Sequence, residues 1–320
     1  MALTQVRRDG GVEQEAPPSA RSAWGRFRRS DLAPALIFIG PWIIGFLWFQ
    51  LYPVIAAVYY GFTAYNMMRP PTFIGLANYR QLFTGDDLFR LALLHSLVYA
   101  LFSVPLDLVV AFVFAVLLNM KIPGRPIFRA AFYFPAVVPT VATAILWVML
   151  LNTQGGLIND ALQVFHLPAI PWLTSPNWTM PALILLSVWT IGPTVVIFLA
   201  GLQDVPQELY EAARMDGAGA LRVVWHVTVP LISPVILFNL VIGVIGAVQI
   251  FSQPFVIFSG SGTPGGPLNS VLMYSVQLYN VAFQQFNMGY AAAMAWVLFL
   301  ILAVFSLVAM RVSERVVHYE

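Results

Sequence analysis

Six long runs of apolar residues, almost free of charge, constrain what this chain can fold into. They cover approximately 34–60, 91–118, 130–151, 178–200, 230–258 and 290–311. Crossing the hydrocarbon core of a bilayer takes roughly 20 residues of helix, and each run is long enough. Only Asp107 and Arg311 within them carry a charge at neutral pH. Because backbone groups in lipid must bond within their own segment, we predict an all-α polytopic membrane protein with six transmembrane helices.

The composition agrees with lipid as the main solvent. Of the 320 residues, 59% are hydrophobic and 9% are charged, whereas roughly a quarter of a soluble domain is charged. The runs divide the chain into a polar leader (1–33), a first transmembrane helix (34–60) and a core (91–311) with the other five helices. We expect the first helix to act as an uncleaved anchor, because its apolar run is too long for a signal peptide.

The basic residues predict the orientation. Thirteen of the 16 Lys and Arg residues fall in the leader, in the 119–129 and 201–229 connections, or in the tail. The 61–90 connection holds the other three, Arg69, Arg80 and Arg90. Since cytoplasmic loops carry the excess of positive charge, we expect a multi-pass protein of the cell membrane with both termini in the cytoplasm and with lipid as a partner.

Several classes of function lack the residues that they need. The chain has no cysteine, and its four histidines are scattered, so no spacing predicts a metal site. No G-x-S-x-G or H-E-x-x-H occurs, and the basic residues follow the membrane boundary instead of forming a nucleic-acid stripe. We therefore expect no enzyme, no metal and no nucleic-acid partner.

The connection over 202–229 is the most informative of the polar segments. Its residues favour two short helices that begin near Pro206 and are broken at Gly217 or Gly219. It also carries apolar side chains that need cover, either from lipid headgroups or from a protein: Leu209, Tyr210, Met215, Leu221, Val224 and Trp225.

The spacing inside this connection resembles the EAA loop of binding-protein-dependent ABC importer permeases. Glu211-Ala212-Ala213 is followed after three residues by Gly217, and after nine more by VTVP, which ends at Pro230. The likeness extends over roughly 33–311, and further segments resemble the carbohydrate-uptake branch of that family. These segments are FIGLANYRQLF (73–83), GRPIFRAAFYFP (124–135), IPWLTSPNW (170–178), GGPLNS (265–270) and MGYAAAMAW (288–296).

This resemblance implies a type 1 ABC importer permease that works by alternating access. In the family, the loop is a coupling helix that docks on a cytoplasmic ATPase subunit. The docking positions carried over are Glu211, Ala212, Ala213 and Gly217, with Pro230 closing the motif. The resemblance further implies a second permease in a heterodimer, two ATPase subunits and an extracellular solute-binding protein.

An ATPase site of its own is not expected in this chain. A phosphate-binding loop ends in Gly-Lys-Ser/Thr, whereas the only lysine, Lys121, stands in NMKIPGR. ATP and Mg²⁺ are therefore expected on partner subunits, and no cofactor on this chain.

Ion coupling is the alternative mechanism, because an acidic residue within the membrane is by default a functional-site hypothesis. Asp107 would carry the proton or ion of a secondary carrier. It stands alone in the sequence, however, and no repeated broken helices are apparent. A structural role for Asp107 and a membrane scaffold without transport activity also stay open.

One face of the fifth run is a candidate for the solute pathway. At 100° per residue, its amide and glycine residues share an arc about 120° wide: Asn239, Gly243, Gly246, Gln249 and Gln253. Neutral amides suit hydroxyl-rich sugars, although glycines and amides also serve helix packing. Trp189 is a further candidate, for stacking on a sugar ring, and Thr190–Thr194 predicts a weak point in the fourth helix. A sugar or polyol is the expected solute, and another solute of the same importer class stays open.

Overall fold

The computed structural model describes residues 32–120, 123–259 and 262–316. The predicted leader over 1–33 lies almost entirely outside these ranges. Within them the chain is helical apart from one short antiparallel strand pair, β1 (Thr63–Ala64) with β2 (Thr72–Phe73). The predicted all-α class is confirmed. The chain divides into two compact units, one ending at Ala56 and one beginning at Ala57.

The first unit is a single run of apolar helix. It contains α2 (Leu32–Phe46), a π-helical turn (Leu47–Leu51) and the start of α3 (Tyr52–Gly61). The π turn lies just before Pro53, whose ring excludes the carbonyl four residues earlier from a helical bond. Large apolar side chains such as Phe38 and Trp42 are exposed, as expected for a helix that faces lipid. Together with the rest of α3, this helix is long enough to span a membrane.

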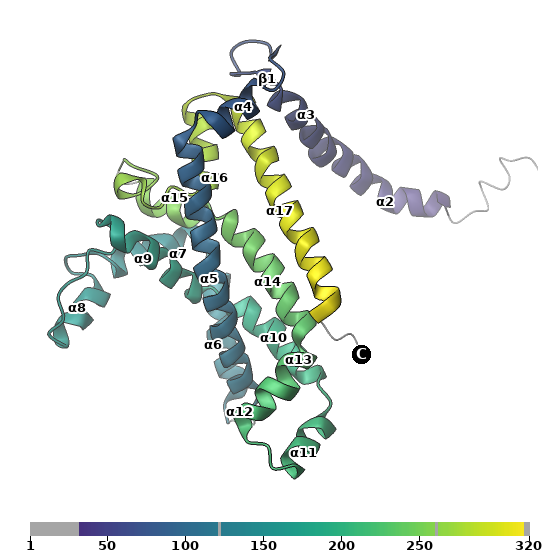
Figure 1. The fold of residues 1–320 in the computed structure, drawn as a ribbon, viewed down its shortest axis with the longest axis vertical. Coiled ribbons are helices and arrows are strands. Elements are labelled where there is room, and N and C mark those ends of the chain that lie inside the picture. Colours follow the sequence, from purple (N-terminus) through teal and green to yellow (C-terminus); the bar gives the residue numbers. More distant parts are fainter. Residues whose placement is uncertain (1–31, 121–122, 260–261, 317–320) are drawn as a thin grey trace, which may run out of the picture. The chain divides into compact units, whose positions relative to one another are not determined.

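The second unit is built around two unbroken helices, α5 (Asp87–Asn119) and α17 (Met288–Val316). Asp86 caps α5 by accepting a hydrogen bond from the Phe89 amide (2.9 Å), and its other oxygen accepts from Tyr290 Oη on α17 (2.6 Å). These bonds tie the starts of the two helices together. Figure 1 shows both starts near β1 and α4 (Ala77–Thr84), at the top of the view.

Two other spans are bent. Helix α6 (Arg125–Val137) meets α7 (Thr140–Leu150) at 97°, and α9 (Pro176–Trp189) meets α10 (Gly192–Asp204) at 49°. Each break precedes a proline, Pro139 or Pro193, which cannot donate the bond that would continue the helix. The described residues therefore hold four membrane-length helices, or six if each bent pair is one span. The weak point predicted over Thr190–Thr194 is a real break.

The fifth span, predicted over 230–258, is one of these four helices, Ser233–Ser259, and it contains a short interruption. It consists of α14 (Ser233–Val248) and α15 (Ser252–Ser259), preceded by α13 (Val229–Leu231), with non-helical residues at Gln249–Phe251. The remaining elements are short: α8 (Leu157–Val164), α16 (Tyr274–Tyr279), a 3₁₀ turn (Pro267–Asn269) and a π turn (Asn280–Gln284).

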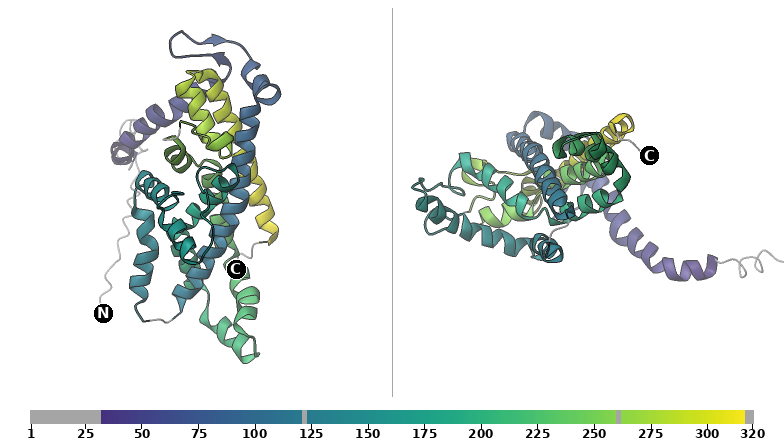
Figure 2. Two further views of the ribbon diagram at one scale, coloured as in Figure 1. Left: turned by 90° about the vertical axis from the view of Figure 1, so that its left-hand side faces the viewer. Right: turned by 90° about the horizontal axis from the view of Figure 1, so that it is seen from below.

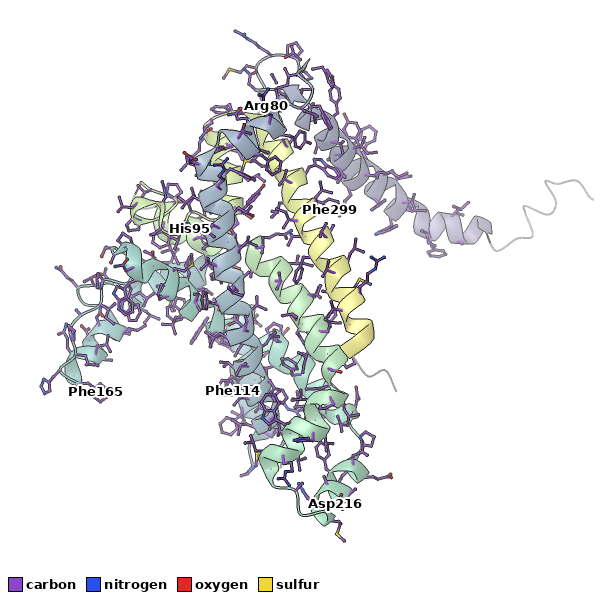
Figure 3. The ribbon with its side chains drawn as sticks, in the orientation of Figure 1. Arg80, His95, Phe114, Phe165, Asp216 and Phe299 are labelled. Atoms are coloured by element: carbon purple, nitrogen blue, oxygen red, sulfur yellow. The ribbon has the colours of Figure 1, made fainter. Side chains whose placement is uncertain are left out.

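Helix α5 is the centre of the second unit and packs against α9, α10, α14 and α16. The connection between α10 and α14 folds into a hairpin of α11 (Gln207–Met215) and α12 (Ala220–Val223). Figures 1 and 2 show this hairpin extending beyond the α5–α6 turn, at the end of the unit opposite β1. Asp216 marks its tip, and Phe114 lies on the neighbouring part of α5 (Figure 3).

Candidate functional site

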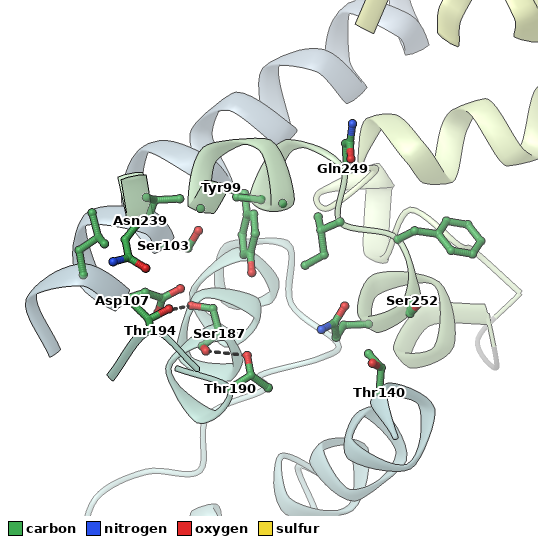
Figure 4. Close-up of a pocket in the computed structure, with 18 residues that line it drawn as sticks. Tyr99, Ser103, Asp107, Thr140, Ser187, Thr190, Thr194, Asn239, Gln249 and Ser252 are labelled. Carbon is green, nitrogen blue, oxygen red and sulfur yellow. Dashed lines mark hydrogen bonds between the residues drawn. The ribbon is translucent and has the colours of Figure 1, made fainter. Parts of the chain in front are cut away.

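A polar cavity of about 400 Å³ lies where α5, α7, the α9–α10 break and the α14–α15 break meet (Figure 4). Its wall combines hydroxyl and amide groups with a few apolar side chains. The lining residues are Tyr99, Ser103, Val104, Asp107, Leu108, Thr140, Ser187, Thr190, Thr194, Asn239, Gly243, Gly246, Ala247, Gln249, Ile250, Phe251, Ser252 and Gln253.

The cavity collects most of the residues that the sequence proposes for the solute pathway. Asp107 and the whole amide-and-glycine face of the fifth span line it. Trp189 does not. Its indole instead stands edge-on against Trp147, with ring centroids 6.2 Å apart, so its neighbour is another aromatic side chain of the bundle.

Helical periodicity explains only part of this face. Asn239, Gly243 and Gly246 share one side of α14, as the 100° spacing predicts. Gln249 lies past the last residue of α14, and Gln253 belongs to α15. Both residues still line the cavity, on either side of the non-helical backbone that follows α14.

Asp107 has a partner that the sequence does not reveal. Ser187 Oγ on α9 donates a hydrogen bond to Asp107 Oδ1 (2.8 Å), although the two residues are 80 positions apart. The carboxyl group is half-buried in the wall of the cavity. This bond joins α5 to α9 immediately before the break at Thr190.

Several hydroxyl residues of the wall were missed by sequence reasoning. They are Tyr99, Ser103, Thr140, Ser187 and Ser252. Three of them, Thr140, Ser187 and Ser252, lie next to helix breaks, whereas Tyr99 and Ser103 lie within the unbroken α5 and carry no such signal. Non-helical backbone at membrane depth is tolerated where it is buried in protein or lines a water-filled cavity. The convergence of three breaks, at 138–139, 190–191 and 249–251, therefore indicates a hydrated cavity.

The hairpin has the break that its sequence predicts. Gly217 adopts a left-handed conformation with φ +76°, and its N–H bonds to Arg214 O (3.0 Å) while Ala218 N–H bonds to Ala213 O (3.0 Å). This pair of bonds is the glycine-dependent helix ending called a Schellman motif. Gly217 thus ends α11 and turns the chain toward α12.

The residues proposed for docking lie on the outer side of this hairpin. Glu211 and Ala212 are exposed, and Glu211 accepts a hydrogen bond from Gln207 (3.1 Å). Ala213 and Pro230 line one shallow depression together with Leu209, Asp216, His226, Val227 and Leu231. Around it Met215, Leu221 and Trp225 are 89%, 73% and 63% exposed, so the apolar side of the hairpin is left uncovered by this chain.

A polar contact joins the base of the hairpin to the end of α5 and the start of α6. Arg125 Nε donates to Leu118 O (2.6 Å). With its amide oxygen turned toward them, Gln203 accepts from Arg125 Nη2 (3.3 Å) and Arg129 Nη2 (2.9 Å). Gln203 lies three residues before Pro206, where the hairpin begins.

Helix α10 extends this contact toward the cavity. Its buried residues Val195, Phe198, Leu199 and Leu202 belong to one apolar cluster with Ala111, Ala115 and Leu118 of α5. Its first residue, Gly192, lies directly against the α6 backbone, because an added Cβ would stand 2.5 Å from Phe132 O. A packed helix therefore connects the hairpin to the break that lines the cavity. Among the described residues, no group of three His, Asp or Glu side chains could hold a metal ion.

Comparison with known proteins assigns the chain to a family. Residues 107–318 match the family model described as binding-protein-dependent transport system inner membrane component. The chain is 40% identical to the probable ABC transporter permease protein YesP of Bacillus subtilis (strain 168), with 91% of this chain and 94% of YesP covered. It is 31% identical to the arabinooligosaccharides transport system permease protein AraP of the same organism, with 95% and 96% covered.

A solved structure agrees with the fold. A chain of the bacterial alginate ABC transporter, in complex with alginate pentasaccharide-bound periplasmic protein, superposes with a TM-score of 0.78 at 23% identity. The superposition covers 92% of this chain and 97% of that one. The fold is thus that of an ABC importer permease. On the family match and on its identity with these permeases over most of their length, this chain is a member of the binding-protein-dependent transport system inner membrane components.

Proposed function

We propose that this chain is the translocating permease of an ATP-driven importer for sugars, and that separate ATPase subunits drive it through the α11–α12 hairpin. The observation that carries the proposal is that one chain holds both a cavity lined by neutral amides and hydroxyls and an uncovered apolar hairpin at the far end of α10. Amides and hydroxyls both donate and accept hydrogen bonds, as sugar hydroxyls require. The arabinooligosaccharide permease relative supports the same solute class.

The proposed assembly follows from what one chain lacks. This chain encloses its cavity only in part, so we propose a second, similar permease that completes it. Two ATPase subunits, which bind ATP and Mg²⁺, would cover the exposed side chains around Glu211, Ala212, Ala213 and Gly217. A solute-binding protein would deliver sugar at the opposite end, and both termini would be cytoplasmic, as the basic residues indicate.

The proposed cycle is one of alternating access. ATP binding would bring the two ATPase subunits together and pull on the hairpins, and α10 would carry that movement to the break at Thr190. An ion-driven carrier that uses Asp107 is not favoured, because the chain belongs to a family of binding-protein-dependent systems and Asp107 already has Ser187 as a partner.

A bulky residue in the docking depression tests this function. In the assembled transporter, Ala213→Trp should fill the depression beside Pro230, so that ATP hydrolysis continues without sugar uptake. Ala142→Trp is the matched control, because Ala142 is an exposed alanine of α7 and lines neither the cavity nor the docking depression. Coupled uptake by the Ala213 variant at the rate of the control would contradict the proposal.

A further inference from the structure

The cavity contains one charged side chain. Of the residues that line it within the described part of the chain, Asp107 alone is acidic, and none is Lys, Arg or His. The other polar groups are amides and hydroxyls. A solute in this cavity therefore meets one carboxyl group and no basic side chain of this chain.

The carboxylate of Asp107 lies in the wall of the space that a solute would occupy. Figure 4 shows Asp107 on the cavity wall beside Ser187, with Tyr99 directed to the same space. Ser187 Oγ donates a hydrogen bond to Oδ1 of this carboxylate (2.8 Å). In a cavity of about 400 Å³, every solute group lies within about a Debye length of this carboxylate, so salt screens their interaction weakly.

The backbone adds little net charge to this cavity. Three helices begin at it: α7 at Thr140, α10 at Gly192 and α15 at Ser252. Three others, α6, α9 and α14, end at the same breaks. Because the start of a helix carries roughly half a positive charge and its end roughly half a negative one, these charges largely cancel, and Asp107 sets the charge of the cavity.

We propose that Asp107 sets the charge preference of the transporter, so that the cavity admits uncharged sugars and disfavours sugar acids. This inference rests on the proposed function, since it concerns sugars in the same cavity. An uncharged hydroxyl donates a hydrogen bond to the carboxylate, whereas a uronate brings a second negative charge next to it. When Asp107 is replaced by a neutral residue, this repulsion is removed and the preference against a uronate is lost.

The test measures contact with the cavity without the selection that a solute-binding protein imposes. The assembled transporter is placed in lipid nanodiscs without that protein and without ATP. The probe is a mixture of neutral pentose and hexose trisaccharides with trisaccharides of equal length that carry one uronic acid. Saturation-transfer difference NMR then gives the ratio of acidic to neutral signal for each variant.

Asp107→Asn should raise this ratio roughly tenfold over the wild type, as expected for removing a charge several ångströms from the ligand in a partly shielded site. Asp107→Glu should keep the wild-type ratio, which separates loss of charge from loss of packing. Asp160→Asn, an equal charge change on exposed α8, should also leave the ratio unchanged.

Two failures have different meanings. Equal ratios for the wild type and Asp107→Asn, with clear neutral-sugar signals in both, would overturn the role of Asp107 and leave the sugar transporter intact. Absence of any trisaccharide signal in the wild type and in all variants would count against sugars as the solute class. The proposed charge preference would then be rejected as well.

Discussion

Gly192 lies so close to Phe132 that the site has no room for a side chain. A Cβ at this position would be 2.5 Å from Phe132 O and 3.1 Å from Tyr133 Cα. Backbone atoms cannot swing aside as a flexible side chain does. The contact therefore fixes the start of α10 against α6, next to the cavity.

Gly192→Ala should destabilise the bundle, because α10 must move away from α6 to admit the methyl group. Overpacking of this kind costs about 1–3 kcal/mol. Thermal unfolding of the purified permease complex measures this loss of stability as a lower midpoint temperature. Gly246→Ala is the control, since its added Cβ would meet no atom within 4 Å, and an equal midpoint for both variants would refute the tight contact.

Gly217→Ala should impair coupling through the shape of the hairpin. Gly217 has φ +76°, which costs an alanine about 1–2 kcal/mol, so the ending of α11 should rearrange. Gly219, with φ −70°, provides the matched control. Uptake per ATP hydrolysed should fall in Gly217→Ala and not in Gly219→Ala. A similar ratio in both would show that the left-handed turn is unimportant.

Gln203→Leu should weaken the link between the hairpin and the connection from α5 to α6. The change removes the oxygen that faces Arg125 and Arg129. Because Gln203 is exposed, the loss should be near the low end for a charged hydrogen bond, about 1 kcal/mol. The expected result is a lower ratio of sugar uptake to ATP hydrolysis, with recovery in Gln203→Glu, whose carboxylate accepts from both guanidinium groups. Failure of the glutamate to restore the ratio would argue against this contact.

Ionophores distinguish the energy source. Uptake into vesicles that contain ATP should continue after proton and sodium gradients are collapsed, because Asp107 is held by Ser187 and no step needs it to carry an ion. Asp107→Asn should not alter this insensitivity. Loss of uptake on adding the ionophore, at constant ATP, would instead support the ion-driven carrier.

The length of the apolar runs predicts the membrane spans well, because the thickness of the bilayer sets how long a spanning helix must be. The break after Thr190 is also visible in the sequence, since Gly192-Pro193 cannot continue a helix. The break at Gln249–Phe251 is not, because these residues contain neither proline nor glycine and an apolar run looks the same whether it is one helix or two.

For a similar reason, the sequence predicts only some of the residues that line the cavity. Periodicity finds residues on one helix, such as Asn239 and Gly243, but it cannot pair Asp107 with Ser187 across 80 positions. Small hydroxyl residues are common throughout the chain, so only the fold shows which of them share a wall. Trp189 is not part of this wall, and the sequence could not show this, because an aromatic residue in an apolar run carries no sign of the direction in which it points.

The dependence of solute movement on the ATPase subunits tests the central claim most directly. Vesicles are prepared with this chain and its partner permease, with or without the ATPase subunits, and are supplied with ATP and sugar-loaded binding protein. The account predicts accumulation of sugar only when ATPase subunits and ATP are both present. Accumulation of sugar by vesicles that lack the ATPase subunits would contradict it.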